Sequence, residues 1–144
     1  MVTVPDASAL RTKLALREAE RAAAAERERS AAEAAHQQWV EALRSPTLPP
    51  DAEERLARRI ALALEQGRLE IELFRFPPEL TTDRARAINQ AEAGWENTLT
   101  GLPKIAHGYW ANKLRDKGYT LRAEVVSYPG GMPGDCALYL GWGE

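Results

Sequence analysis

The side chains best suited to chemistry in this sequence are two arginines near the start of a short predicted helix. Arg84 and Arg86 flank that start together with Thr82 and Asp83. Paired guanidinium groups at such a place can bind a carboxylate or a phosphate through parallel hydrogen bonds. The same residues are also typical of a solvated helix face, so both interpretations stay open.

A loop rich in glycine and proline is the second candidate binding element. Residues 129–135 read PGGMPGD, and the backbone N–H groups of Gly130 and Gly131 can cradle an anion. The segment lacks the Gly-Lys-Ser/Thr ending of a phosphate-binding loop and leads into a strand instead of a helix. A wide hairpin loop with glycines at positive φ is the alternative interpretation. If a ligand binds here, we expect its site between this loop and the helix over residues 81–90.

The other reactive side chains do not form a catalytic or metal-binding pattern. Cys136 is the one cysteine and opens an apolar strand, where a cysteine is typical of a small core residue rather than a nucleophile. His36 and His107 have no Cys, His or carboxylate at ligand spacing. The sequence therefore predicts no catalytic residues, no cofactor and no metal site.

The elements that position these residues divide at a proline-rich break, residues 45–50. Before the break, residues 6–44 contain no glycine or proline and are dominated by alanine, glutamate and arginine, which are strong helix formers. One continuous helix of this length would extend roughly 60 Å, which is more than a small core can cover. Such a helix is either solvated or packed against another surface.

The apolar residues of this long predicted helix do not form a heptad seam. Leucines, including Leu14, cluster near its start, and Ala32, Ala35, Trp39 and Leu43 form a stripe at helical spacing near its end. The polar run between the two groups excludes a leucine-zipper dimer. We expect a solvated helix with local ion pairs, self-association through these residues, or docking to another helical protein.

A second helix is predicted between Asp51, which opens a capping box with Glu54, and Gly67, which suits a left-handed C-cap. Its apolar face contains Leu56, Ile60, Ala63 and Leu64. We expect this face to pack on the apolar stripe of the long helix and to form an antiparallel helical hairpin. Residues 1–67 are thus predicted to be a helical arm and hairpin, and residues 68–144 an α+β head domain.

The second domain is predicted to contain three strands, residues 69–76, 121–126 and 136–142, the last two forming an antiparallel hairpin. Apolar positions at helical spacing predict a short helix that ends at Gly94 and a longer helix over residues 103–117 with a broad apolar face. The fold class is therefore α+β. A long N-terminal helical hairpin precedes a small, mainly antiparallel sheet, which two helices cover on one face.

The outer face of this sheet is expected to be polar. Arg122 lies near Glu70 and Glu72 if the second predicted strand pairs with the first. Tyr139 and Trp142 point to opposite faces of the last strand, so they do not both lie under the helices. One of them is therefore exposed or covered by a partner, and both are interface candidates.

Composition narrows the class of protein. The chain has 19 basic and 21 acidic residues, and no segment carries the basic excess that nucleic-acid binding needs. No apolar run approaches the roughly 20 residues of a membrane-spanning helix, and the N-terminus does not resemble a secretory signal. We expect a cytoplasmic protein that binds neither membranes nor nucleic acids.

The sequence as a whole favours a non-catalytic protein–protein interaction or assembly module. In this reading the alanine-rich helix self-associates into a homo-oligomer or docks a helical partner. The alternative is a small ligand-binding or enzymatic domain, with its site between residues 129–135 and residues 81–90.

Overall fold

The computed structural model describes residues 2–143, and its two compact parts meet inside the first helix. One part ends at Trp39 and the other begins at Val40. The helix α1, Ala7–Arg44, runs through this boundary, so its last turn belongs to the same part as the sheet. We call the part up to Trp39 the arm and the part from Val40 onward the head. The division differs from the predicted boundary between residues 67 and 68, because the second helix lies in the head.

α1 is the 38-residue helix that its composition predicts. It begins after Asp6, whose carbonyl oxygen accepts hydrogen bonds from the N–H groups of Ala9 and Leu10. In its polar middle, Arg29 Nη1 lies 2.7 Å from Glu26 Oε2. Alanine content and local ion pairs of this kind support the helix without a core of its own.

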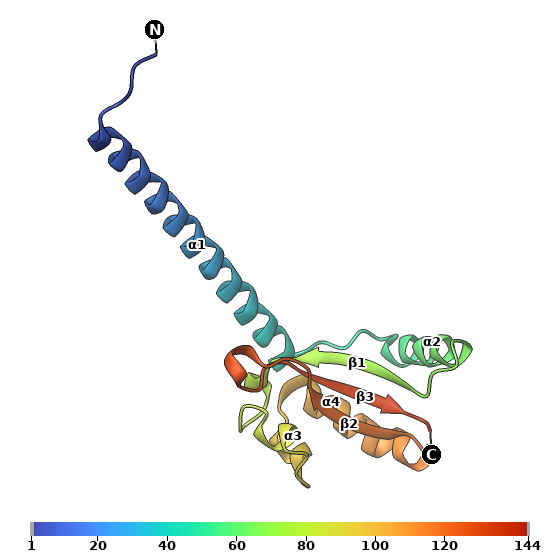
Figure 1. Cartoon of the computed structure of the whole chain (residues 1–144). Helices are drawn as coiled ribbons and strands as arrows, with labels where there is room; N and C mark the ends of the chain where they lie inside the picture. The colour runs from blue at the N-terminus through green and yellow to red at the C-terminus, as the bar shows by residue number, and fades with distance from the viewer. Residues whose placement is uncertain (1, 144) are drawn as a thin grey trace. The chain divides into compact units, whose positions relative to one another are not determined.

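The head contains the sheet and the remaining helices (Figure 1). In chain order these are α2 (Ala52–Glu65), β1 (Glu70–Phe76), α3 (Arg86–Asn89), α4 (Gly101–Tyr109), β2 (Thr120–Val125) and β3 (Cys136–Gly141). A π-turn, Trp110–Leu114, and a 3-10 turn, Arg115–Lys117, continue α4. Further 3-10 turns lie at Pro78–Leu80, Trp95–Thr98 and Pro129–Gly131. The predicted α+β class, with a long N-terminal helix and a small antiparallel sheet, is confirmed.

β3 is the central strand, so the order of the sheet is β1-β3-β2 and both pairs are antiparallel (Figure 1). The pairing of β2 with β3 confirms the predicted hairpin, whereas β1 and β2 do not pair directly, because β3 lies between them. Arg122 nevertheless reaches Glu70 by crossing the ring of Tyr139, which lies 4.1 Å from the guanidinium carbon. Its Nη2 ends 2.7 Å from Glu70 Oε1.

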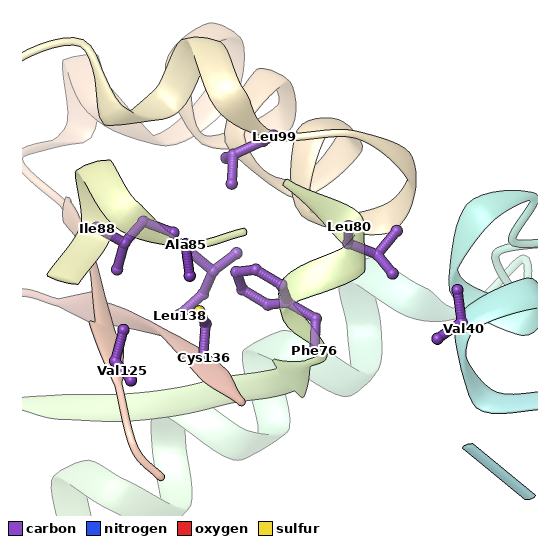
Figure 2. Packing of buried hydrophobic residues seen from close by; sticks show 9 residues of the cluster. All are labelled: Val40, Phe76, Leu80, Ala85, Ile88, Leu99, Val125, Cys136 and Leu138. Carbon is purple, nitrogen blue, oxygen red and sulfur yellow. The ribbon is translucent and has the colours of Figure 1, made fainter. Parts of the chain in front are cut away.

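One face of the sheet carries its large apolar side chains. Cys136, Leu138 and Leu140 alternate along β3 and are fully buried. Phe76 and Val125 are paired with Cys136 from either side and therefore lie on the same face. Figure 2 shows the cluster that contains Phe76, Val125, Cys136 and Leu138, whereas Leu140 belongs to a second cluster. The burial of this face supplies the main apolar core of the head.

The last turn of α1 packs against the same cluster. Val40 is 1% exposed and belongs to the cluster, where Leu80 lies nearest to it in Figure 2. Leu43 is half-buried and packs against the cluster as well. Leu43, which the sequence analysis placed in an interface stripe, is therefore part of the core of the head.

α2 packs on the sheet instead of on the apolar stripe of α1. Its buried residue Ala63 forms a cluster with Ile71 of β1, against which Leu56 and Ile60 also pack. Leu64, expected on the inner face, is exposed. The predicted packing of a helical hairpin is therefore wrong, because β1 and β3 offer α2 a larger apolar surface than alanines can.

The ends of α2 agree only in part with the predicted caps. Gly67 follows the helix at a φ of +73°, as a left-handed C-cap requires. Asp51 makes no side-chain cap hydrogen bond, and its Oδ2 instead accepts a hydrogen bond from Arg55 Nε at 2.9 Å. The predicted capping box is therefore wrong, because an ion pair one turn along the helix engages the carboxylate.

Gly101, the first residue of α4, lies where the end of α1 meets the core. Its φ is +60°, which favours glycine. A Cβ at this position would clash with the carbonyl oxygen of Leu43 and lie 2.8 Å from Leu80 Cδ1. The close approach of α1 and α4 therefore depends on a residue without a side chain.

The substitution Gly101→Ala is expected to lower the free energy of unfolding by about 3 kcal/mol, because it adds a backbone clash to the strain of a positive φ. Gly130→Ala is the matched control, since its φ is +62° and a Cβ there would meet no atom within 4 Å. We expect this control to lose about 1 kcal/mol. Urea unfolding followed by circular dichroism measures both, and equal losses would contradict a tight contact between α1 and α4.

Candidate functional site

An apolar groove of about 410 Å³ lies in the head, between the start of α2, β1 and α4. Its volume falls within the usual range for small-molecule sites. Its most buried lining residues are Leu114 and Leu140, and its wall includes Leu48 and Ile105, which are 51% and 43% exposed. The groove thus has an apolar base and is open to solvent along one side.

A bulge in β1 shapes one wall of the groove. The register of β1 against β3 shifts between Glu72 and Phe74, and Leu73 at the shift lines the groove. Arg59 of α2 donates hydrogen bonds to the carbonyl oxygens of Glu72 and of Leu73, the latter at 3.1 Å. Bulges re-aim side chains and are common beside binding sites. Arg59 therefore satisfies two backbone acceptors at the place where the strand departs from regular geometry.

A π-turn shapes the opposite wall. The sequence predicts one regular helix over residues 103–117, but the backbone widens into a π-turn at Trp110–Leu114, and both of its end residues line the groove. Trp110 Nε1 donates to the carbonyl oxygen of Tyr119 at 2.9 Å, and the guanidinium of Arg115 lies 4.4 Å from the Trp110 ring. Insertions of this kind are frequent at functional sites. Trp110 is therefore held in place on two sides.

The polar part of the lining includes a tyrosine and a glutamate. The carboxylate of Glu53 and the phenol of Tyr109 both line the groove. Burial of the phenol raises the pKa of Tyr109, and its interaction with the charged Glu53 raises it further. Tyr109 therefore stays protonated at neutral pH and remains a hydrogen-bond donor beside an anionic group.

Sequence analysis assigned the broad apolar face of residues 103–117 to the core and missed the groove. The apolar residues were visible, but Leu48 and Leu56 lie more than 40 positions away from Ile105 in the chain. Only the packing of α2 on β1 brings the segment around Leu48 and Leu56 next to α4, with the groove between them.

The two candidate anion-binding arginines lie on an irregular segment. The helix expected there is reduced to α3, and Arg84 and Ala85 before it have φ values of 53° and 67°. Arg84 is exposed, and the Nη1 of Arg86, also exposed, lies 2.8 Å from Glu92 Oε1. One of the two guanidinium groups is thus already paired with a carboxylate.

Side chains before α3 hold this irregular segment. The N–H of Ala85 donates to Thr81 Oγ1 at 2.6 Å, and the N–H of Ala87 donates to Asp83 Oδ2 at 2.9 Å. These bonds satisfy backbone donors that a helix would otherwise satisfy. The segment is therefore built around caps, which explains why α3 is short.

The loop over residues 129–135 lies beside α3, because Tyr128 Oη donates to Asn89 Oδ1 at 2.8 Å. The structure thus brings together the two segments of the predicted ligand site. Gly130 and Gly131 have positive φ values, as a wide loop requires, and a Cβ on either would meet no atom within 4 Å. Their backbone faces open space, so an anion site at these glycines stays a prediction.

The interface candidates on the arm are accessible to different extents. Leu14, Ala32 and Ala35 are exposed, whereas Trp39 is half-buried and makes an edge contact with the ring of His36, with 6.0 Å between the ring centroids. The exposed residues are free of core packing and available to another surface.

Tyr139 and Trp142 lie on different sides of the sheet, as predicted. Tyr139 is on the outer face under the guanidinium of Arg122. Trp142 packs against the cluster around Ala63 and makes an edge contact with Tyr119, with 6.4 Å between centroids. Its Nε1 is buried and has no hydrogen-bond partner within residues 2–143. The outer aromatic residue is therefore covered by an arginine of its own sheet.

Cys136 is a core residue, as predicted from its place in an apolar strand. It is fully buried in the main cluster. Burial, followed by the charges of Asp135 and Asp83, raises the pKa of the thiol to about 12. The thiolate, which is the nucleophilic form, is therefore disfavoured in the folded protein.

The raised pKa of Cys136 predicts a loss of stability at alkaline pH. The contribution is fully present below the pKa of an unfolded cysteine, near 8.5, and is lost as the pH rises toward 12. We expect the urea midpoint of the wild type to fall more between about pH 8 and about pH 10.5 than that of Cys136→Ala, which lacks this group.

The burial of Cys136 also predicts that a thiol reagent labels the protein only after unfolding. Rapid labelling of the native chain would contradict the burial.

Between residues 2 and 143, no group of three or more His, Cys, Asp or Glu side chains is placed to hold a metal ion. None of the helices described there is long and apolar enough to cross a membrane. Comparison with protein families, curated proteins and solved structures finds no match to this chain.

Proposed function

We propose that the protein is a non-catalytic assembly module that self-associates through the arm part of α1. The observation that carries the proposal is the exposure of large apolar side chains on a long helix. Leu10, Leu14 and Leu16 are 46%, 57% and 59% exposed. Leucines exposed in this way are favourable to bury against a second surface.

A single face of α1 combines most of these apolar residues. At 3.6 residues per turn, ten residues of the arm fall within about 80° of the helix circumference. They are Ala7, Leu10, Leu14, Arg17, Arg21, Ala25, Glu28, Ala32, Ala35 and Trp39. We call them the α1 stripe, and Ala7, Ala25, Arg17 and Ala35 form its two edges. The stripe includes all four arm residues that sequence analysis selected as interface candidates.

The charges in the α1 stripe favour an antiparallel pair of identical helices. If Ala24 and Ala25 of the two copies meet at the centre, Arg21 of each copy lies opposite Glu28 of the other. The same register places Leu10 opposite Trp39. Within residues 2–143, neither Arg21 nor Glu28 forms an ion pair, so both charges remain available to a second copy. A parallel pair would instead place like charges opposite each other.

The small residues of the stripe are compatible with this pairing. Ala25, Ala32 and Ala35 allow two helix backbones to approach closely, and the register places Leu14 of one copy against Ala35 of the other. The same patch then serves both copies, as a two-fold interface requires. This arrangement needs no heptad repeat, which the arm lacks.

The location in the cell and the class of partner are part of the same proposal. We propose a cytoplasmic location, because Cys136 is a free thiol and a reducing compartment suits a free thiol. A protein partner, here a second copy, suits the balanced charge of the chain better than a nucleic acid does.

Charge reversal in the stripe tests the proposal. Each single variant, Arg21→Glu or Glu28→Arg, places like charges opposite each other twice in the dimer. We expect each to raise the dissociation constant roughly tenfold. The double variant restores opposite charges and is expected to associate as the wild type does. Sedimentation equilibrium at several protein concentrations measures all four proteins.

Arg27→Glu and Glu20→Arg are matched controls, since they reverse charges on the same helix but outside the stripe. We expect both to associate like the wild type. A wild type that stays monomeric at every concentration would overturn self-association. Single variants that dimerise normally, or a double variant that does not recover, would overturn the antiparallel register.

A further inference from the structure

We infer that the apolar groove of the head binds a small amphipathic amine, with its hydrocarbon body against Leu114 and Leu140 and its ammonium group at Glu53. This site lies wholly within the head and is separate from the α1 stripe. The inference therefore goes beyond the proposed assembly function and does not depend on it.

The lining explains the hydrocarbon body of the ligand. Apart from Glu53, Arg59 and the hydroxyl of Tyr109, the groove is lined by apolar or aromatic side chains, among them Leu48, Ala52, Leu56, Leu73, Phe74 and Ile105. A hydrocarbon chain or ring that fills part of the 410 Å³ would bury apolar surface on both sides of the groove. The volume suits a small molecule.

The walls are held before any ligand binds. Arg59 links α2 to the bulge of β1, and the hydrogen bond of Trp110 to Tyr119 fixes the π-turn on the other side. Because the chain makes these contacts with its own residues, a ligand does not have to order the walls. The groove is therefore a preformed site.

The polar groups of the lining explain the choice of an amine. Glu53 lines the groove, is exposed and forms no ion pair within residues 2–143, so its carboxylate oxygens can accept hydrogen bonds from a ligand. The terminal nitrogens of Arg59 are both engaged with backbone carbonyl oxygens of β1. The acceptor available to a ligand is thus anionic, and an ammonium group complements it.

Titration of the full-length protein with three probes of equal chain length tests the inference. Octylammonium, octanol and octanoate share the hydrocarbon body and differ only in the head group. Isothermal titration calorimetry, at probe concentrations below aggregation, gives the affinity of each. We expect saturable binding that is tightest for octylammonium and weakest for octanoate.

Variants at the polar end separate the roles of charge and of apolar surface. Glu53→Gln is expected to weaken octylammonium binding roughly two- to fivefold, as for a solvent-exposed ion pair, and to leave octanol binding unchanged. Glu54→Gln is the matched control, because Glu54 is the exposed neighbour that does not line the groove. We expect it to bind all three probes like the wild type.

Variants in the apolar wall test the location of the site. Ala52→Trp is expected to fill the groove and to weaken every probe at least tenfold. Ile105→Asn removes an exposed part of the wall without touching the core, and Leu62→Asn is its control on an exposed position outside the groove. We expect Ile105→Asn to weaken all probes and Leu62→Asn to weaken none.

Three outcomes would overturn the inference. They are the absence of saturable binding, octanoate binding at least as tight as octylammonium binding, and binding that neither Ala52→Trp nor Ile105→Asn weakens. A monomeric wild type would overturn the assembly proposal and leave these results untouched, so the two failures are distinguishable.

Discussion

The head depends on the burial of β3 between two other strands and under one layer of covering segments. Cys136, Leu138 and Leu140 of β3 lie on the covered face, and Tyr139 lies on the opposite face, where an ion pair crosses the strand from Arg122 to Glu70. Only one face of this sheet carries large apolar side chains, so only that face has to be covered. The last turn of α1, α2, α3 and α4 all bury their apolar residues there, and the position of each is constrained by that shared surface.

The groove follows from the way this surface is covered. α2 and α4 both pack toward β1 and β3, and the bulge at Leu73 and the π-turn after Tyr109 both contribute residues to the lining of the groove between them. Both irregularities interrupt regular backbone hydrogen bonding, and Arg59 and Trp110 compensate for them with side-chain bonds. Two departures from regular geometry therefore line the same cavity, and irregularities of both kinds are frequent near functional sites.

The arm obeys a different constraint. Its residues up to Trp39 form a unit without a buried core, so the helix is supported by alanine propensity and by local pairs such as Glu26 and Arg29. Its exposed leucines are therefore available to another copy of the chain. Because the α1 stripe and the groove lie in separate units, the assembly and the ligand binding that we propose can be tested by separate substitutions.

The sequence by itself determined the features that depend on neighbouring residues. The length of α1, the left-handed Gly67 after α2 and the core position of Cys136 follow from propensity, local backbone geometry and alternation. Only the tertiary structure decided that β3 is central, that α2 packs on β1, and that an open groove remains beside α4. These features depend on which apolar surfaces from distant parts of the chain bury the most area against each other. The periodicity of apolar residues within one segment does not tell which other segment it will pack on.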